Sequence, residues 1–178
     1  WDRKIDFLKE VLAAPLNRST VFLGKCLGGV TDSMIQVTII MVLGFFIFPD
    51  LEYTLQSLML VYLYLFLLAV IMTSLGLIIG SRMDSPEGFS LITSLVVFPM
   101  YFLSGALFLK KNLIDEAPLI YWITAINPAS YAVDAIRYTL IPEDIFLEYG
   151  LSRDLAVLIG FCVFLLALGT QSFKTMKL

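Results

Sequence analysis

The chain has no histidine and only two cysteines, Cys26 and Cys162, among its 178 residues. Without histidine it can build neither a Ser-His catalytic pair nor a His-liganded metal site. The two cysteines fall inside apolar runs, so we expect them to be small packing residues. The sequence also lacks a G-x-x-x-x-G-K-[ST] phosphate loop,. We therefore expect no enzymatic activity, no metal site and no cofactor bound by this chain itself.

Charged residues are scarce as well, at 15% of the chain, whereas hydrophobic residues make up 59% and the mean hydropathy is +0.89. Ordinary soluble domains contain more charge and less apolar surface, so a water-soluble core is excluded. Acidic residues outnumber basic ones and give a net charge of −3. This acidic balance argues against nucleic acid as a partner.

Four long apolar runs occupy most of the sequence, at residues 20–48, 55–79, 89–108 and 155–169. About 20 predominantly apolar residues are enough for an α-helix to cross a hydrocarbon core about 30 Å thick. Such a helix satisfies its own backbone hydrogen bonds where water is absent. The sequence therefore predicts an all-α polytopic transmembrane bundle, with four spans surrounded by membrane lipid. We treat residues 1–178 as one domain.

The basic residues predict how this bundle is oriented. If residues 1–19 are cytoplasmic, eight of the twelve basic residues lie inside, namely Arg3, Lys4, Lys9, Arg18, Lys25, Arg82, Lys174 and Lys177. An excess of Lys and Arg near span ends marks the cytoplasmic side. We expect a multi-pass protein of the cytoplasmic membrane with both ends of the chain inside.

The segment 109–154 then lies outside and is too apolar for a disordered linker. Asn127 is a good N-cap, and Pro128 suits the first helical position. Residues 129–140 are expected to form a helix of about 18 Å, too short to span, that ends before Pro142. A re-entrant or interfacial helix and a surface cap over the bundle are both open.

Residues 1–19 contain a short helix with one apolar face, stopped by Pro15,. One hypothesis is a cytoplasmic element that docks on a soluble partner. The other is an interfacial helix that lies on the inner leaflet.

Four motifs occur in a defined order along the sequence. Residues 7–19 read FLKEVLAAPLNRS, residues 75–80 read LGLIIG, residues 98–108 contain P-x-x-x-L-S-G, and residues 127–138 contain N-P-x-x-Y-x-x-x-x-x-R. Together they resemble ABC exporter permeases of the type-2 membrane family, which ordinarily have six spans. By this resemblance the chain corresponds to the part from the cytoplasmic coupling helix onward, without the first two spans.

The resemblance implies the membrane subunit of an ATP-driven exporter, in which two permease copies pair and each coupling helix docks on a separate ATP-binding subunit. ATP and Mg would bind to that subunit. The cargo would be a hydrophobic or amphipathic compound, such as a drug, an antibiotic or a lipid-linked molecule. A non-transporting membrane scaffold or sensor is the alternative. The coupling-helix residues would be Phe7, Leu8, Leu12 and Ala13, with Lys9, Glu10 and Arg18 as their polar rim.

Three further sets of residues are candidates for function within the bundle. Asp32 and Gln36 lie one turn apart in the first run, and an intramembrane acid marks a pathway or a buried contact; a solvated inner vestibule is the alternative. Ser104 could mark a gate or only the point where a helix breaks. Close helix packing in lipid is the expected role of Gly24, Gly28 and Gly29. Asp134 and Arg137 are spaced to form an ion pair on the external helix; two independently solvated charges are the alternative.

Overall fold

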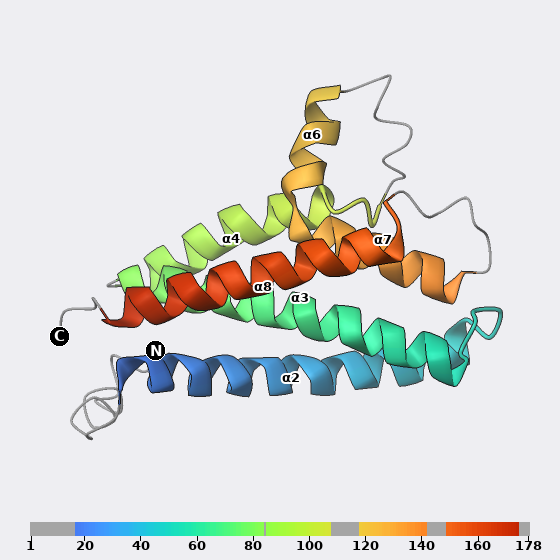
Figure 1. Cartoon of the computed structure of the whole chain (residues 1–178), viewed down its shortest axis with the longest axis horizontal. Coiled ribbons are helices and arrows are strands. Elements are labelled where there is room, and N and C mark those ends of the chain that lie inside the picture. The colour runs from blue at the N-terminus through green and yellow to red at the C-terminus, as the bar shows by residue number, and fades with distance from the viewer. Residues whose placement is uncertain (1–16, 84, 108–117, 142–148, 175–178) are drawn as a thin grey trace.

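The computed structural model describes residues 17–83, 85–107, 118–141 and 149–174. Within these ranges all regular structure is α-helical, which confirms the predicted fold class (Figure 1). The helices are α2 (Arg18–Ile47), α3 (Leu55–Arg82), α4 (Pro86–Phe102), α6 (Pro118–Ile126), α7 (Pro128–Leu140) and α8 (Leu151–Lys174).

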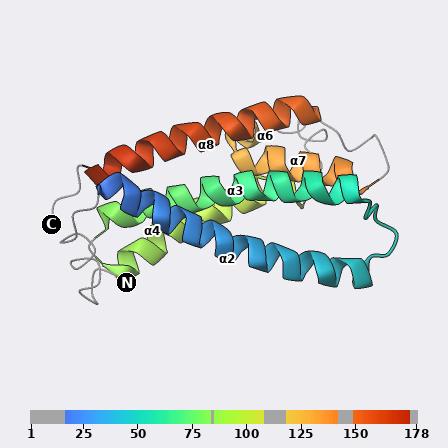
Figure 2. The ribbon, with the colours of Figure 1, turned by 60° about the horizontal axis from the view of Figure 1, so that its bottom comes forward.

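The long helices run side by side, and their ends define two ends of the bundle (Figures 1 and 2). At one end α2 begins, α3 ends, α4 begins and α8 ends. We call it the basic end, because Arg18, Arg82 and Lys174 lie there. The opposite end holds residues 48–54, the turn between α2 and α3, and we call it the turn end. Residues 17 and 174 therefore lie at the same end of the bundle.

Three helices are long and apolar enough to cross a membrane: α2 with 30 residues, α3 with 28 and α8 with 24. The remaining predicted span forms α4, which has 17 residues and is about 26 Å long at 1.5 Å per residue. In Figure 1 α4 stops short of the turn end. The expected count of four spans thus stays a prediction.

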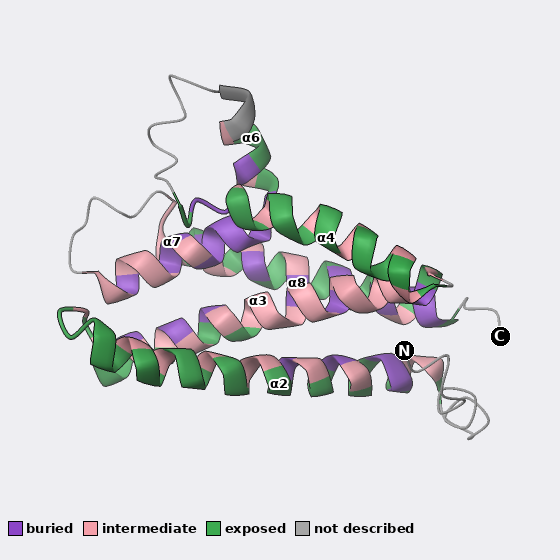
Figure 3. Ribbon diagram, turned by 180° about the vertical axis from the view of Figure 1, so that it is seen from behind, coloured by how far each residue is buried: buried purple, intermediate pink, exposed green. Residues whose placement is uncertain are grey.

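Helix α3 forms the centre of the bundle, with α2, α7 and α8 packed around it. The side chains of Tyr64 and Ile71 on α3 are buried against Leu158 and Leu165 of α8. On α2 the buried side chains are Val21, Phe22, Cys26 and Val30. Much of the rest of its surface is exposed, as Figure 3 shows. Exposed apolar side chains of this kind are compatible with a lipid environment.

Glycines allow close helix contacts at two places. A Cβ atom on Gly169 of α8 would overlap the ring of Phe22 from α2, and the same ring lies 5.2 Å from the ring of Phe173, centroid to centroid. A Cβ atom on Gly29 would lie 2.7 Å from the Cγ2 atom of Thr73 on α3. Small residues therefore set how closely α2 approaches α8 and α3.

Both cysteines are buried free thiols that face α3. The Sγ atom of Cys26 lies 3.5 Å from the Oγ atom of Ser74. The thiol of Cys162 donates to the carbonyl oxygen of Leu67 at 3.3 Å. Each thiol thus supplies a weak polar contact between neighbouring helices.

Helix α7 begins where the sequence predicts, since the Oδ1 atom of Asn127 accepts a hydrogen bond from the backbone N–H of Ala129 at 3.0 Å. Most of α7 is buried between α3 and α8. Its last residue, Leu140, accepts a hydrogen bond from the backbone N–H of Glu52 in the turn between α2 and α3. Helix α7 thus packs along the side of the bundle toward the turn end (Figure 1). Whether it is a re-entrant or interfacial helix or a surface cap stays a prediction.

Candidate functional site

The proposed coupling-helix residues at positions 7–10, 12 and 13 lie outside the described residues. Arg18 is described, and it begins α2 at the basic end with a half-buried side chain. The segment that would carry them therefore joins the bundle at the same end as the last residue of α3 and the first of α4 (Figure 1).

Asp32 and Gln36 lie on an exposed ridge of α2 together with two of the glycines. Gly24, Gly28, Asp32 and Gln36 follow one another at four-residue intervals, and all four are exposed. A Cβ atom on Gly24 or Gly28 would have no neighbouring atom within 4 Å among the described residues. We call these four residues the α2 ridge. Of the three predicted packing glycines, Gly29 contacts another helix within the chain, whereas Gly24 and Gly28 face outward.

Neighbouring hydroxyl groups on α2 are satisfied within the helix itself. Thr31, Ser33 and Thr38 each donate to the carbonyl four residues earlier, at 2.8 to 2.9 Å. The polar character of the α2 ridge therefore comes from Asp32 and Gln36. A carboxylate is costly at membrane depth unless it faces water or a protein partner, so this ridge is not suited to hydrocarbon alone.

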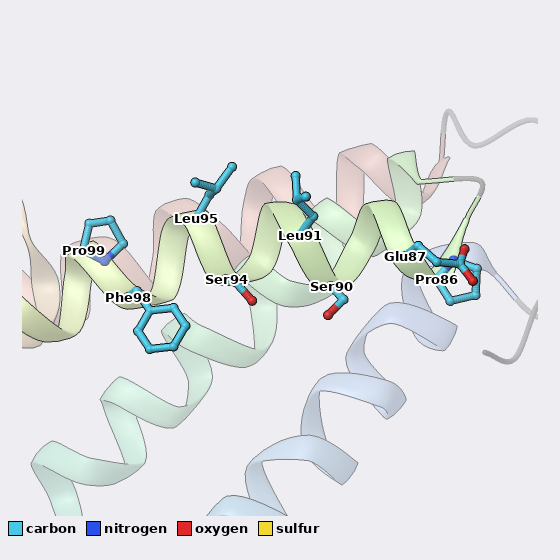
Figure 4. A pocket seen from close by; sticks show the side chains of 8 residues that line it. All are labelled: Pro86, Glu87, Ser90, Leu91, Ser94, Leu95, Phe98 and Pro99. Atoms are coloured by element: carbon cyan, nitrogen blue, oxygen red, sulfur yellow. The ribbon is translucent and has the colours of Figure 1, made fainter.

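Helix α4 presents a second open face. It has no buried residue, and Leu91, Leu95 and Phe98 are each between 63% and 66% exposed. Figure 4 shows Leu91 and Leu95 along one edge of the helix and Ser90, Ser94 and Phe98 along the other. They line a shallow groove with a volume of about 920 Å³. We call Ser90, Leu91, Ser94, Leu95 and Phe98 the α4 face.

The last turn of α4 and the residues after it are held by side chains from the beginning and the last turn of α7. Helix carbonyls near a C-terminus have no partner within the helix and need other donors. Asn127 donates from Nδ2 to the carbonyl of Met100 at 2.7 Å, and Ser130 donates from Oγ to that of Leu103 at 3.2 Å. Arg137 donates from Nη2 to the carbonyl of Ala106 at 2.7 Å. We call these three bonds the α4–α7 clasp.

Ser104 takes part in the turn that ends α4. It is buried; its hydroxyl donates to the carbonyl of Tyr101 at 2.7 Å and accepts from the backbone N–H of Ala106 at 3.2 Å. The next residue, Gly105, has φ of +79°, which strongly favours glycine. Of the two hypotheses for Ser104, the observed bonds fit the helix break; a role in a pathway stays a prediction.

The structure joins some of the predicted residues and separates others. Two of the sequence motifs, at residues 98–108 and 127–138, meet in the α4–α7 clasp. By contrast, α2 and the end of α4 lie on opposite sides of α3 (Figures 1 and 3). Ser104 is therefore not adjacent to the α2 ridge within one chain.

Helix α7 is also bound to the start of α8 by aromatic and charged groups. The rings of Tyr131 and Tyr149 stack with centroids 4.9 Å apart, and the Arg153 guanidinium lies 5.2 Å from the Tyr149 centroid. The carboxylate of Asp134 accepts a hydrogen bond from the backbone N–H of Tyr149 at 3.0 Å. Asp134 and Arg137 thus each bond to another segment of the chain. An ion pair between the two residues stays a prediction.

Sequence reasoning found the clasp donors Asn127 and Arg137 as parts of a motif, but it missed what they bind. It also missed a polar cluster at the basic end that consists of Ser81, Arg82 and Ser172. Serines of this kind in apolar helices are the only signal in the sequence, and they do not reveal their partners.

These features define the class of the protein as a multi-pass helical membrane protein, with the short helix α7 packed against its long helices. The comparisons with known proteins then identify the family. Residues 1–141 match the model of the ABC-2 type transporter family, and the chain belongs to that family. It is thus a membrane component of a transporter.

Two curated relatives agree with this assignment. The chain is 31% identical over 145 residues to the protein named "Putative transport permease ycf38" of Cyanophora paradoxa, and 28% identical over 139 residues to the protein of the same name from Porphyra purpurea. Each match covers 78% of this chain but only 47% and 46% of the respective relatives. The chain therefore spans about half the length of these relatives. No solved structure gives a significant match.

Proposed function

We propose that the chain is the membrane-spanning permease part of an ATP-driven exporter that moves a hydrophobic or amphipathic compound out of the cell. The observation that carries this proposal is the match of residues 1–141 to the ABC-2 type transporter family. Three spanning-length helices and the exposed Asp32 midway along α2 support it.

Energy comes from a separate ATP-binding subunit in this proposal, which binds the ATP and Mg. Residues 1–16 dock on that subunit with an apolar face of Phe7, Leu8, Leu12 and Ala13. The basic end of the bundle is then the cytoplasmic end, in line with its Arg18, Lys25, Arg82 and Lys174,. The protein lies in the cytoplasmic membrane.

A second copy of the chain packs on the α4 face. Ser90 and Ser94 are four residues apart, which lets a second helix approach closely in lipid. The exposed Leu91, Leu95 and Phe98 supply contact area around them. A helix with no buried residue gains most from such a partner, because its own chain provides few contacts,.

The α2 ridge lines part of the transport pathway. Asp32 and Gln36 supply a polar track one helical turn long on an otherwise apolar surface, which suits a cargo that carries a polar group on an apolar body. The cargo class rests on the sparse charge of the bundle, at 15% of the chain.

Co-purification tests the proposal. The chain is expressed together with candidate ATP-binding subunits of ABC transporters from the same organism, and the amount of each that is retained on the tagged chain is measured. We expect retention by the wild type and loss with the double change Leu8→Asp and Leu12→Asp. The change Leu51→Asp in the α2–α3 turn adds a charge at the opposite end and should retain the subunit. Equal retention by all three forms would favour a scaffold that does not couple to ATP.

A further inference from the structure

A polar cluster lies at the basic end of the bundle, where α3 and α8 end. The Oγ atoms of Ser81 and Ser172 are 3.0 Å apart, and both residues are buried. The Nε atom of Arg82 donates a hydrogen bond to the Oγ atom of Ser172 at 3.3 Å. The guanidinium of Arg82 is thus held in place by a buried hydroxyl pair, although Arg82 itself is exposed.

This arrangement leaves part of the guanidinium for another group. Arginine has five N–H donors in a planar fork. Within the described part of the chain, Arg82 donates to Ser172 from Nε. The two terminal nitrogens are then available for an anion. A fork held in this way loses less side-chain entropy when it binds a phosphate than a freely moving arginine does.

A groove with a volume of about 610 Å³ adjoins the cluster. Its walls come from three helices, with Ile79 on α3, Ile92 on α4 and Leu168 on α8, while Arg82, Gln171 and Ser172 form its polar rim. Lys174 lies three residues after Gln171 and is exposed, so a second basic group lies on the same side of α8,. The groove thus combines an apolar floor with a basic rim at one end of the bundle.

We propose that this groove binds an anionic phospholipid, with the headgroup phosphate on Arg82 and the upper part of an acyl chain on Ile79, Ile92 and Leu168. A free anion would gain nothing from the apolar walls, and a neutral lipid would gain little from the guanidinium. Basic pockets between helices on the cytoplasmic side are suited to anionic headgroups. The assignment of this site to the cytoplasmic leaflet rests on the orientation given in the proposed function. The lipid site itself rests on the geometry of Arg82 and the groove.

Lipid retention on the purified full chain tests this proposal. The protein is purified in detergent, incubated with equal amounts of phosphatidylglycerol and phosphatidylcholine, and examined by native mass spectrometry. We expect the wild type to retain phosphatidylglycerol preferentially. Arg82→Gln should reduce that preference about tenfold, because it removes charge-assisted hydrogen bonds. Arg82→Lys keeps the charge without the fork and should restore part of the preference.

Two other variants distinguish the contribution of the headgroup contact from that of the acyl-chain contact. Arg153→Gln makes the same change of charge at the turn end and should leave the preference intact. Ile92→Trp fills the groove and should reduce the retention of both lipids. Each variant is compared with the wild type only if it elutes as a single species from a size-exclusion column.

The proposal is overturned by any of three results. These are equal retention of the two lipids by the wild type, an unchanged preference in Arg82→Gln, and displacement of the lipid by inorganic phosphate at millimolar concentration. No ATP-binding subunit is present in this experiment. Failure of subunit docking would therefore leave the lipid result unaffected. Failure of lipid binding would likewise leave the co-purification result unaffected.

Discussion

Asn127 connects two segments that are 27 positions apart, because its Nδ2 atom donates to the carbonyl of Met100 at 2.7 Å. Its Oδ1 atom at the same time accepts from the backbone N–H of Ala129 and caps α7. A single side chain therefore begins one helix and holds the end of another. Since no residue of α4 is buried, we expect this bond to matter for stability.

Asn127→Asp separates the two roles, because a carboxylate keeps the cap acceptor but has no N–H donor. The change leaves the carbonyl of Met100 without its donor and should lower the free energy of unfolding by about 1–3 kcal/mol. Thermal unfolding in detergent measures the effect. Ser85→Ala removes only the cap bond to Gly88 at the exposed start of α4 and should cost about 1 kcal/mol or less. An Asn127→Asp protein as stable as the wild type would show that the bond from Asn127 to Met100 contributes nothing to stability.

Gly169→Ala should weaken the contact between α2 and α8. A Cβ atom there overlaps the ring of Phe22, which is fully buried, so either the ring or the helix has to move, at a cost of about 1–3 kcal/mol. Gly160→Ala on the same helix is the matched control, because that position is exposed with open space around it. The control should be neutral or slightly stabilising. Equal melting temperatures for the two variants would contradict the packing described above.

Ser94→Cys tests the second copy on the α4 face. In a protein with Cys26→Ser and Cys162→Ser, we expect oxidation to join two chains through position 94, which appears as a dimer on a non-reducing gel. Val163→Cys places a thiol on an equally exposed position of α8 and should give little dimer. Cross-linking at position 163 but not at position 94 would place the second copy on α8 instead.

Asp32→Asn tests the pathway on the α2 ridge. If the carboxylate contacts the cargo or its water, efflux of a fluorescent amphiphilic dye should fall several-fold, while the amount of protein in the membrane stays the same. Asp50→Asn removes an equally exposed acid from the α2–α3 turn and should leave efflux unchanged. Unchanged efflux in Asp32→Asn would exclude a pathway role for that residue.

Much of the helical architecture could be predicted, because apolar runs and helix signals are local. Asn127 and Pro128 located the start of α7 for this reason. The end of α4 was predicted at residue 108 but lies at Phe102, since apolar residues continue past the turn at Ser104 and Gly105. Hydropathy does not report the positive φ of Gly105 or the bonds of Ser104 that end the helix. Helix α6 was not predicted from the sequence.

The contacts between segments could not be predicted in the same way. Spacing placed Asp134 and Arg137 on one face of a helix, but it could not show that Asp134 binds Tyr149 and that Arg137 binds Ala106. The polar cluster of Ser81, Arg82 and Ser172 joins residues about 90 positions apart. Such partners are fixed by how α3, α4, α7 and α8 pack together, which no local pattern in the sequence specifies.

The central claim is that residues 1–16 face the cytosol, where a soluble ATP-binding subunit can reach them. It is tested most directly by labelling single cysteines with a membrane-impermeant maleimide, in a protein with Cys26→Ser and Cys162→Ser. We expect Leu8→Cys to react only after the cells are opened, and Asp50→Cys, at the other end of α2, to react in intact cells. Reaction of Leu8→Cys in intact cells would contradict both the orientation and the proposed coupling to ATP.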